Sequence, residues 1–246
     1  MLISAMVGID SRATMDIYTT LRNYPLNCES AEQIVRQIAD VEIDDKISFV
    51  IKKTEEIMED SEYQGVRLSL DAYLDKTRIP LKIDISTGDV ITPCEISFSY
   101  QLMFENRTIP LLAYPPETVL AEKLETILSR GEANTRLRDF YDVYILQRED
   151  FVVTPDALCH ALLATCRKRG HEDLLHTYAS ILDRVRQSDT MRTQWMKYQS
   201  YFDYAAGITW DTVLDTVETL CMKTLDDHAF GDELPQEESQ FEMHLL

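Results

Sequence analysis

The chain has 246 residues, of which 45% are hydrophobic, and a formal net charge of -19. This composition suits one sizeable core or two small domains, and no apolar run in the sequence is long enough to cross a bilayer. The acidic excess argues against indiscriminate binding to nucleic acid, because phosphates are repelled at long range. Residues 120–200 carry equal numbers of acidic and basic side chains, so a local contact with an RNA end remains compatible with the sequence.

The N-terminus is mildly apolar, but it has no basic flank and reaches Asp10 quickly, which is not typical of a signal peptide. The 5 cysteines are scattered and form no CxxC pair. This pattern favours reduced thiols in a cytosol over disulfides or a zinc site. We therefore expect a cytoplasmic protein without a membrane contact.

The first part of the sequence predicts a mixture of strands and helices. A helix is predicted over residues 30–43, with Asn27 or Ser30 as its start signal. Strands are predicted where apolar residues alternate with polar ones or run between turn signals. These strand segments are residues 12–20, 47–52, 66–73, 79–85 and 96–104.

From Tyr114 onward the sequence predicts helices. Pro116 suits the first turn of a helix that ends at Gly131. Further helices are predicted over residues 134–147, 154–169, 172–187, 190–202 and 209–224. The fold class is therefore α+β, with a sheet-containing core over residues 1–113, a helical domain over residues 114–225 and an acidic flexible tail over residues 226–246.

Two of the predicted strands contain carboxylates suited to a metal. Asp16 and position 18 point to the same side of a strand, where a pair of carboxylates can hold magnesium ions against a triphosphate. Position 18 is Tyr18, whose neutral phenol is a poor magnesium ligand. Asp84 lies in an apolar strand, where a lone carboxylate is costly unless it is paired or bound to a metal. The alternatives are a solvated edge strand and a Lys82–Asp84 ion pair.

Two of the predicted helices contain further candidates. Lys123 either extends to water from an amphipathic helix or provides a charge for the phosphates of a nucleotide. Asp139 and Asp142 are neighbours on one helix face, and the alternative for them is a surface with weak ion pairs. The sequence contains no zinc-binding histidine pattern, P-loop or dinucleotide motif.

These four segments, in this order, resemble the AbiEii/AbiGii toxin family of nucleotidyltransferases. RATMDI resembles the family's Arg-x-Thr-x-Asp-x-Asp strand, LKIDISTGD its Lys-x-Asp strand, TVLAEKLETIL its Ala-Glu-Lys helix, and RDFYD its Arg-Asp-x-x-Asp segment. The resemblance covers about two-thirds of the chain. It implies a polymerase-beta-like nucleotidyltransferase core followed by a helical region, which together form the toxin of a bacterial type IV toxin–antitoxin system.

The resemblance also implies ligands, partners and site residues. The ligands would be Mg²⁺ and a nucleoside triphosphate (NTP). The acceptor would be an RNA such as the 3′ end of a transfer RNA (tRNA), and an antitoxin would be encoded alongside. Carried over by position, the site residues would be Asp16 and Asp84 for the metal, Lys123, Asp139 and Asp142 for catalysis, and Arg12, Thr14 and Lys123 for the nucleotide.

Two features depart from the family pattern. Tyr18 stands where the family has its second aspartate, and the family's glycine turn would lie upstream of Met1, before a helix that corresponds to residues 2–7. We therefore expect an N-terminally truncated copy. Loss of a metal carboxylate can cost several kcal/mol in the transition state, which predicts strongly impaired transfer. The alternatives are a degenerate, non-catalytic binding protein of this fold and a purely structural helical interaction protein.

Overall fold

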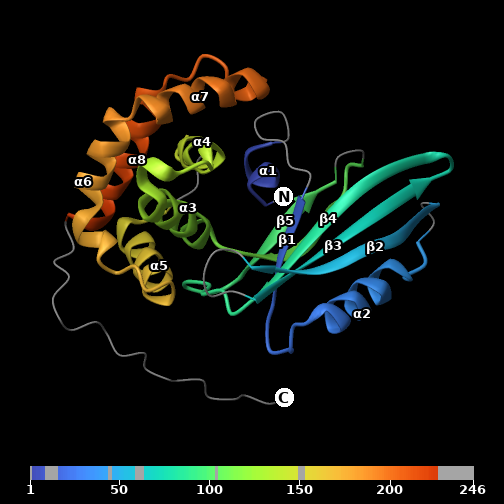
Figure 1. Cartoon of the computed structure of the whole chain (residues 1–246). Helices are drawn as coiled ribbons and strands as arrows, with labels where there is room; N and C mark the ends of the chain where they lie inside the picture. The colour runs from blue at the N-terminus through green and yellow to red at the C-terminus, as the bar shows by residue number, and fades with distance from the viewer. Residues whose placement is uncertain are drawn as a thin grey trace.

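The computed structural model describes residues 2–8, 16–43, 46–58, 64–102, 105–148 and 153–226. Strands dominate the N-terminal half and helices the C-terminal half, and the two halves lie next to each other (Figure 1). The predicted α+β class is confirmed. Arg12, Thr14 and the predicted tail from residue 227 onward lie outside the described residues.

Four of the described strands form the larger sheet, in the order β1-β4-β3-β2. β2 (Ile47–Met58), β3 (Gln64–Leu74) and β4 (Thr77–Thr87) make an antiparallel meander, and β1 (Asp16–Leu21) pairs in parallel with β4. β2 continues well past its predicted end at residue 52. The charged segment KKTEE hides the strand pattern in the sequence, but after an irregularity at Lys52 its backbone stays paired with β3.

One face of this sheet packs against α2 (Cys28–Ala39), which lies beside β2 in Figure 1. The apolar contact consists of Ala31, Val35, Val66, Leu68, Leu70 and Ile85. Asn27 caps the helix in a reciprocal capping box with Ser30, as its sequence signal predicts. The helix ends before the predicted residue 43, and Ile38 and Val41 are exposed instead of buried.

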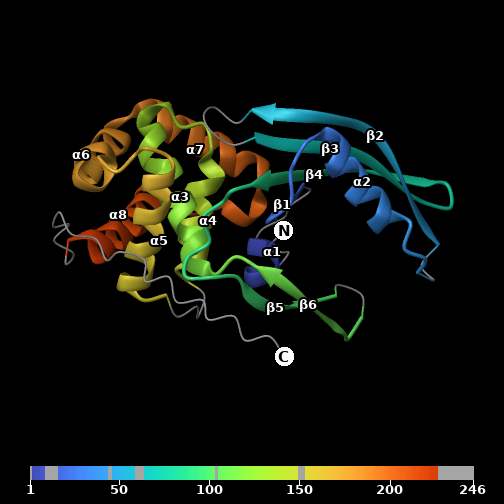
Figure 2. The same cartoon turned by 90° about the horizontal axis from the view of Figure 1, so that it is seen from below.

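A second, smaller sheet pairs β5 (Ile96–Gln101) with β6 (Thr108–Ala113) in antiparallel fashion. The sequence did not predict β6, because it contains Pro110, which cannot donate a hydrogen bond to a ladder. In Figure 2, α1 (Leu2–Val7) lies near β5 and β6. Ile3 and Val7 of α1 join the core of the helical half.

The helical half closely follows the predicted helices. Its elements are α3 (Pro116–Arg130), the short turn η1 (Gly131–Ala133), α4 (Leu137–Leu146), α5 (Pro155–Lys168), α6 (Leu174–Gln187), α7 (Asp189–Tyr201), the turn η2 (Asp203–Ala205) and α8 (Trp210–Leu225). Pro116 starts α3, and Gly131 ends it with a φ of 49°, which favours glycine. A single core joins these helices around Leu124, Phe140 and Trp195.

The described helices include none that combines the length and apolar character needed to cross a membrane. The structure describes all five cysteines, and each is a free thiol.

Candidate functional site

A cavity of about 1410 Å³ lies between the four-stranded sheet and the helical half. We call it the main cavity. Asp84 of β4, Lys123 of α3 and Asp139 of α4 all line it, although they are far apart in the sequence. The fold thus brings together three of the side chains that the sequence predicted to act in one site.

The sheet side of the main cavity is built around Asp84. In the parallel pair of β1 and β4, Tyr18 lies directly opposite Asp84. The Tyr18 side chain is exposed, whereas Asp84 is buried. Nε and Nη2 of Arg67 donate to Oδ1 and Oδ2 of Asp84, each at 2.7 Å. The partner of Asp84 is therefore Arg67 of the neighbouring strand, and the alternative Lys82–Asp84 pair is wrong.

The roles predicted for Asp16, Arg12 and Thr14 stay predictions. Asp16 begins β1 and its backbone lies opposite Lys82 of β4, but its side chain is not among those described. Arg12 and Thr14 precede the described part of β1.

The side chains described on the sheet side of the main cavity are not suited to bind two magnesium ions. Two magnesium ions on a triphosphate need several carboxylate oxygens as ligands. Here Asp84 is held by a guanidinium, and Tyr18 provides a phenol where a carboxylate is needed. The described residues also contain no group of three or more His, Cys, Asp or Glu side chains that could hold a metal ion.

The helical side of the main cavity carries a cluster of three charges. Nζ of Lys123 donates to Oδ1 of Asp139 at 2.7 Å and lies 3.7 Å from Oδ2 of Asp142. Both carboxylates are buried, so the alternative of a charged surface with weak ion pairs is wrong. Burial alone lowers the pKa of Lys123, but the two carboxylates outweigh it and hold the pKa above its ordinary value. Lys123 is therefore charged at neutral pH.

One carboxylate oxygen of Asp139 has no hydrogen-bond donor in the described part of the chain. Its Oδ2 atom is buried and has no hydrogen-bond partner among the described residues. A buried acceptor without a donor is costly. A hydroxyl or amine would have to reach this oxygen to satisfy it.

Asp89 links the sheet to the helical half, and the sequence did not single it out. Oδ2 of Asp89 accepts from Oγ of Ser86 at 2.5 Å, from the hydroxyl of Tyr114 at 2.6 Å and from Oγ1 of Thr20. These partners come from the ends of β1 and β4 and from the segment before α3. Burial, followed by the charge of Asp89, raises the pKa of Tyr114, so its phenol stays protonated as a donor.

A second acid–base cluster joins α3 to the end of α5. Glu125 is buried, and it accepts from Arg169 and lies 2.7 Å from Nδ1 of His171. Glu122 lies one residue before Lys123 and also lines the main cavity. Burial, followed by the charge of Asp89, raises the pKa of Glu122 to about 7. No local sequence pattern indicated this cluster, because its members meet only when the helices pack.

The outer part of the helical side is cationic and aromatic. Arg136 and Arg138 at the start of α4 line the main cavity together with Lys197 and Tyr201 of α7. The Arg138 guanidinium lies over the ring of Phe202, 5.5 Å from its centroid. The Tyr201 side chain is 70% exposed, so one ring face is available for stacking.

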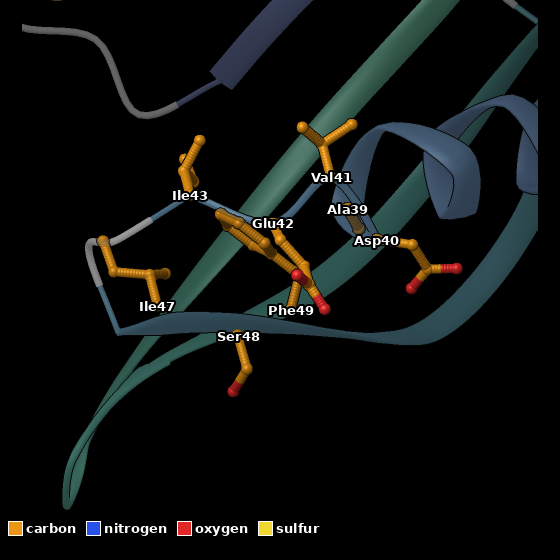
Figure 3. Close-up of a pocket in the computed structure, with 8 residues that line it drawn as sticks. All are labelled: Ala39, Asp40, Val41, Glu42, Ile43, Ile47, Ser48 and Phe49. Carbon is orange, nitrogen blue, oxygen red and sulfur yellow. The ribbon is translucent and has the colours of Figure 1, made fainter.

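A separate cavity of about 640 Å³ lies between the end of α2 and the start of β2. Figure 3 shows its side chains, which include the apolar groups of Val41, Ile43 and Phe49 from both segments. None of the predicted site residues that the structure describes lines it. The main cavity is therefore the candidate functional site.

Comparisons with known proteins agree with the predicted family. A family model described as "Nucleotidyl transferase AbiEii toxin, Type IV TA system" matches residues 1–216. No curated protein matches the chain. A crystallised candidate nucleotidyltransferase from H. pylori is 10% identical, with a TM-score of 0.37, and the match covers 92% of this chain and 95% of that one. JHP933 from Helicobacter pylori is 12% identical, with the same TM-score, over 92% of this chain and 91% of its own.

Proposed function

Because the chain belongs to the AbiEii family of nucleotidyltransferase toxins of type IV toxin–antitoxin systems, we propose that its main cavity binds an NTP and that its transfer of a nucleotide to an acceptor is strongly impaired. The family match confirms the resemblance on which the sequence prediction rested. Membership in the family supports the nucleotide as substrate and an antitoxin encoded alongside as partner. The impairment rests on residues of this chain.

The observation that carries the nucleotide proposal is the charge cluster of Lys123, Asp139 and Asp142. Lys123 is charged, partly exposed and directed into the main cavity, where an ammonium can bind phosphate oxygens as a point charge. The unsatisfied Oδ2 of Asp139 lies beside it and can accept a proton or a hydrogen bond from a hydroxyl. This pair of functions suits a triphosphate and an attacking hydroxyl.

The proposed impairment rests on Tyr18 and Arg67. A divalent cation, when bound in nucleotidyltransferases, stabilises the negative charge that develops on the transferred phosphoryl group. Tyr18 removes one carboxylate ligand of such a cation, and Arg67 already compensates the charge of Asp84. The loss of this stabilisation slows nucleotide transfer by several orders of magnitude.

The outer cationic and aromatic surface supports an RNA end as the acceptor, such as the 3′ end of a tRNA. Arg136, Arg138 and Lys197 provide charge for the phosphates, and Tyr201 provides a ring on which a base can stack. These cations line one cavity on a chain whose net charge is -19, which favours RNA binding there over the rest of the acidic surface.

A second candidate function is nucleotide binding without catalysis. The bidentate Arg67–Asp84 contact favours it, because this contact removes a metal ligand without removing the cavity. The two candidates differ only in whether residual transfer can be measured.

The first test is binding. Each of the four NTPs, in magnesium buffer, should raise the melting temperature of the purified chain, because a ligand of the folded state stabilises it. Asp139→Asn should reduce the shift, and Lys223→Ala, an exposed position on α8, should leave it unchanged. Absence of a shift with every nucleotide would overturn the proposed site.

The second test is transfer. The chain is incubated with labelled NTPs, magnesium and total bacterial tRNA, beside the Asp139→Asn variant as a background control. We expect labelling close to that background. Robust incorporation by the unmodified chain would show that Tyr18 and Arg67 are tolerated and that the impairment is wrong.

A further inference from the structure

Four charged or phenolic residues form a row across the larger sheet. Tyr18 lies opposite Asp84 in the pair of β1 and β4, and Asp84 lies opposite Arg67 in the pair of β4 and β3. Glu55 of β2 continues the row beyond Arg67. Directly opposed residues on adjacent strands point to the same face. The row therefore belongs to the face that Tyr18 and Asp84 present to the main cavity.

Within this row, the Arg67 guanidinium binds both oxygens of Asp84. Both contacts measure 2.7 Å, and the planar fork of arginine matches a carboxylate in this geometry. The Asp84 side chain is only 7% exposed, whereas that of Arg67 is 35% exposed. The negative charge of the buried Asp84 carboxylate is thus compensated by the positive charge of the Arg67 side chain.

A second pair on the same sheet provides a natural comparison. Nη1 of Arg78 lies 3.6 Å from Oδ2 of Asp71, and the Arg78 side chain is 61% exposed. Asp71 is as buried as Asp84, since both side chains are 7% exposed. The two pairs differ in how closely the arginine binds and not in the burial of the carboxylate. Arg78 is therefore a matched control for Arg67.

The other charges around Asp84 do not favour a divalent cation. Lys82 precedes Asp84 by two residues in β4 and points to the same face. The side chain opposite Asp84 in β1 is the neutral phenol of Tyr18. Hard divalent cations are held by several anionic or carbonyl oxygens. Among the side chains described next to Asp84, cationic groups outnumber carboxylates.

We propose that Arg67 is a built-in counter-ion that replaces the divalent cation at Asp84, so that this chain binds its NTP as a metal-free anion. The inference rests on the proposed function, because it concerns the nucleotide in the main cavity. With Arg67 as the counter-ion of Asp84, nucleotide binding does not require a carboxylate at position 18. The phosphate charge is compensated by cationic side chains that line the main cavity, which include Lys123, Arg136, Arg138, Arg169 and Lys197.

The decisive experiment compares nucleotide binding with and without divalent metal. ATP, GTP, CTP and UTP are titrated into the unmodified chain by calorimetry, in excess magnesium and in excess EDTA. The affinity for the nucleotide that binds best should change by less than about two-fold. A loss of about ten-fold or more in EDTA would overturn the counter-ion role and leave nucleotide binding intact. If no nucleotide binds in either buffer, the proposed function fails instead.

A titration with Mn²⁺ alone tests the metal directly, without nucleotide. Electron paramagnetic resonance measures the free ion, and we expect no saturable binding to the unmodified chain. Saturable binding that Asp84→Asn abolishes would contradict the proposal.

Two variants then assign the effect to Arg67. Arg67→Met should gain Mn²⁺ binding and make nucleotide affinity metal-dependent, while Arg78→Met should change neither. Circular dichroism establishes first that Arg67→Met is folded, because it leaves a buried carboxylate without its partner. A folded Arg67→Met that still binds no Mn²⁺ would show that Arg67 is not what excludes the metal. Should this variant not fold, the titrations on the unmodified chain decide the question.

Discussion

Nδ1 of His171 lies 2.7 Å from Oε1 of Glu125, and the other oxygen of Glu125 accepts from Arg169. The carboxylate is almost fully buried on α3, whereas its two partners follow α5. The contact fixes the end of α5 against α3 at the edge of the main cavity. It does so by hydrogen-bond geometry, which is more specific than apolar packing.

Glu125→Ala should lower the free energy of unfolding by about 1–3 kcal/mol, because Arg169 and His171 lose their partner at a half-buried site. Urea unfolding measures the change. Glu218→Ala is the control, because Glu218 also binds an arginine but is more exposed, and it should cost less than about 1 kcal/mol. Equal losses of unfolding free energy in both variants would show that the burial of Glu125 does not increase the contribution of its contacts to stability.

Lys123→Met should destabilise the fold by about 3–5 kcal/mol at neutral pH, because Asp139 and Asp142 remain buried without their cation. Urea unfolding measures the change. Lys223→Met, on the exposed side of α8, should cost little. Equal losses for Lys123→Met and Lys223→Met would exclude the two buried carboxylates as the cause.

Glu122→Gln should stabilise the protein at alkaline pH. The pKa of Glu122 is raised from 4.5 to about 7, mainly by burial and next by Asp89, so the folded state favours the protonated acid. Stability from this group is full below pH 4.5 and is lost as the pH rises through about 7. Glutamine is neutral throughout and avoids this loss. We expect a gain of about 1–3 kcal/mol at about pH 8 and almost none at about pH 4.

Melting temperatures over this pH range would check the Glu122 prediction. Glu132→Gln, at an exposed position after α3, is the control and should show no such trend. Parallel curves for Glu122→Gln and the unmodified chain would mean that Glu122 titrates normally.

Tyr201→Ala should weaken the binding of tRNA about ten-fold, because a stacked base contributes about 1–3 kcal/mol. Tyr201→Trp should retain binding, since it keeps an aromatic face. Filter binding at fixed ionic strength measures the affinity. Tyr24→Ala is the matched control, because Tyr24 is also exposed but does not line the main cavity. An equal effect of both alanine variants would remove Tyr201 from the acceptor surface.

The parts of the fold that the sequence predicted well are those set by local chemistry. Pro116 and Gly131 bound α3 because proline suits a first helical turn and glycine accepts a positive φ. Asn27 starts α2 because its side chain caps a free backbone N–H. Lys123 and Asp139 were named as site residues from the family resemblance, and the structure shows that they are in contact.

The parts that the sequence did not predict depend on contacts between distant segments. Arg67 reaches Asp84 only through the register of β3 and β4, which no local pattern reveals. Asp89 reads as a turn residue until the ends of β1, β4 and the segment before α3 converge on it. β6 was missed because Pro110 is unusual in a strand and is tolerated here in a two-stranded sheet.

The parallel pairing of β1 with β4 also bears on the order in which the protein folds. β2, β3 and β4 follow one another through short connections, whereas α2, β2 and β3 separate β1 from its partner β4 in the chain. Closing a long loop costs more entropy than closing a hairpin, so contacts between distant segments form late. We therefore expect Arg67 to meet Asp84 within an early hairpin, and Tyr18 to pair later beside a carboxylate that already has its cation.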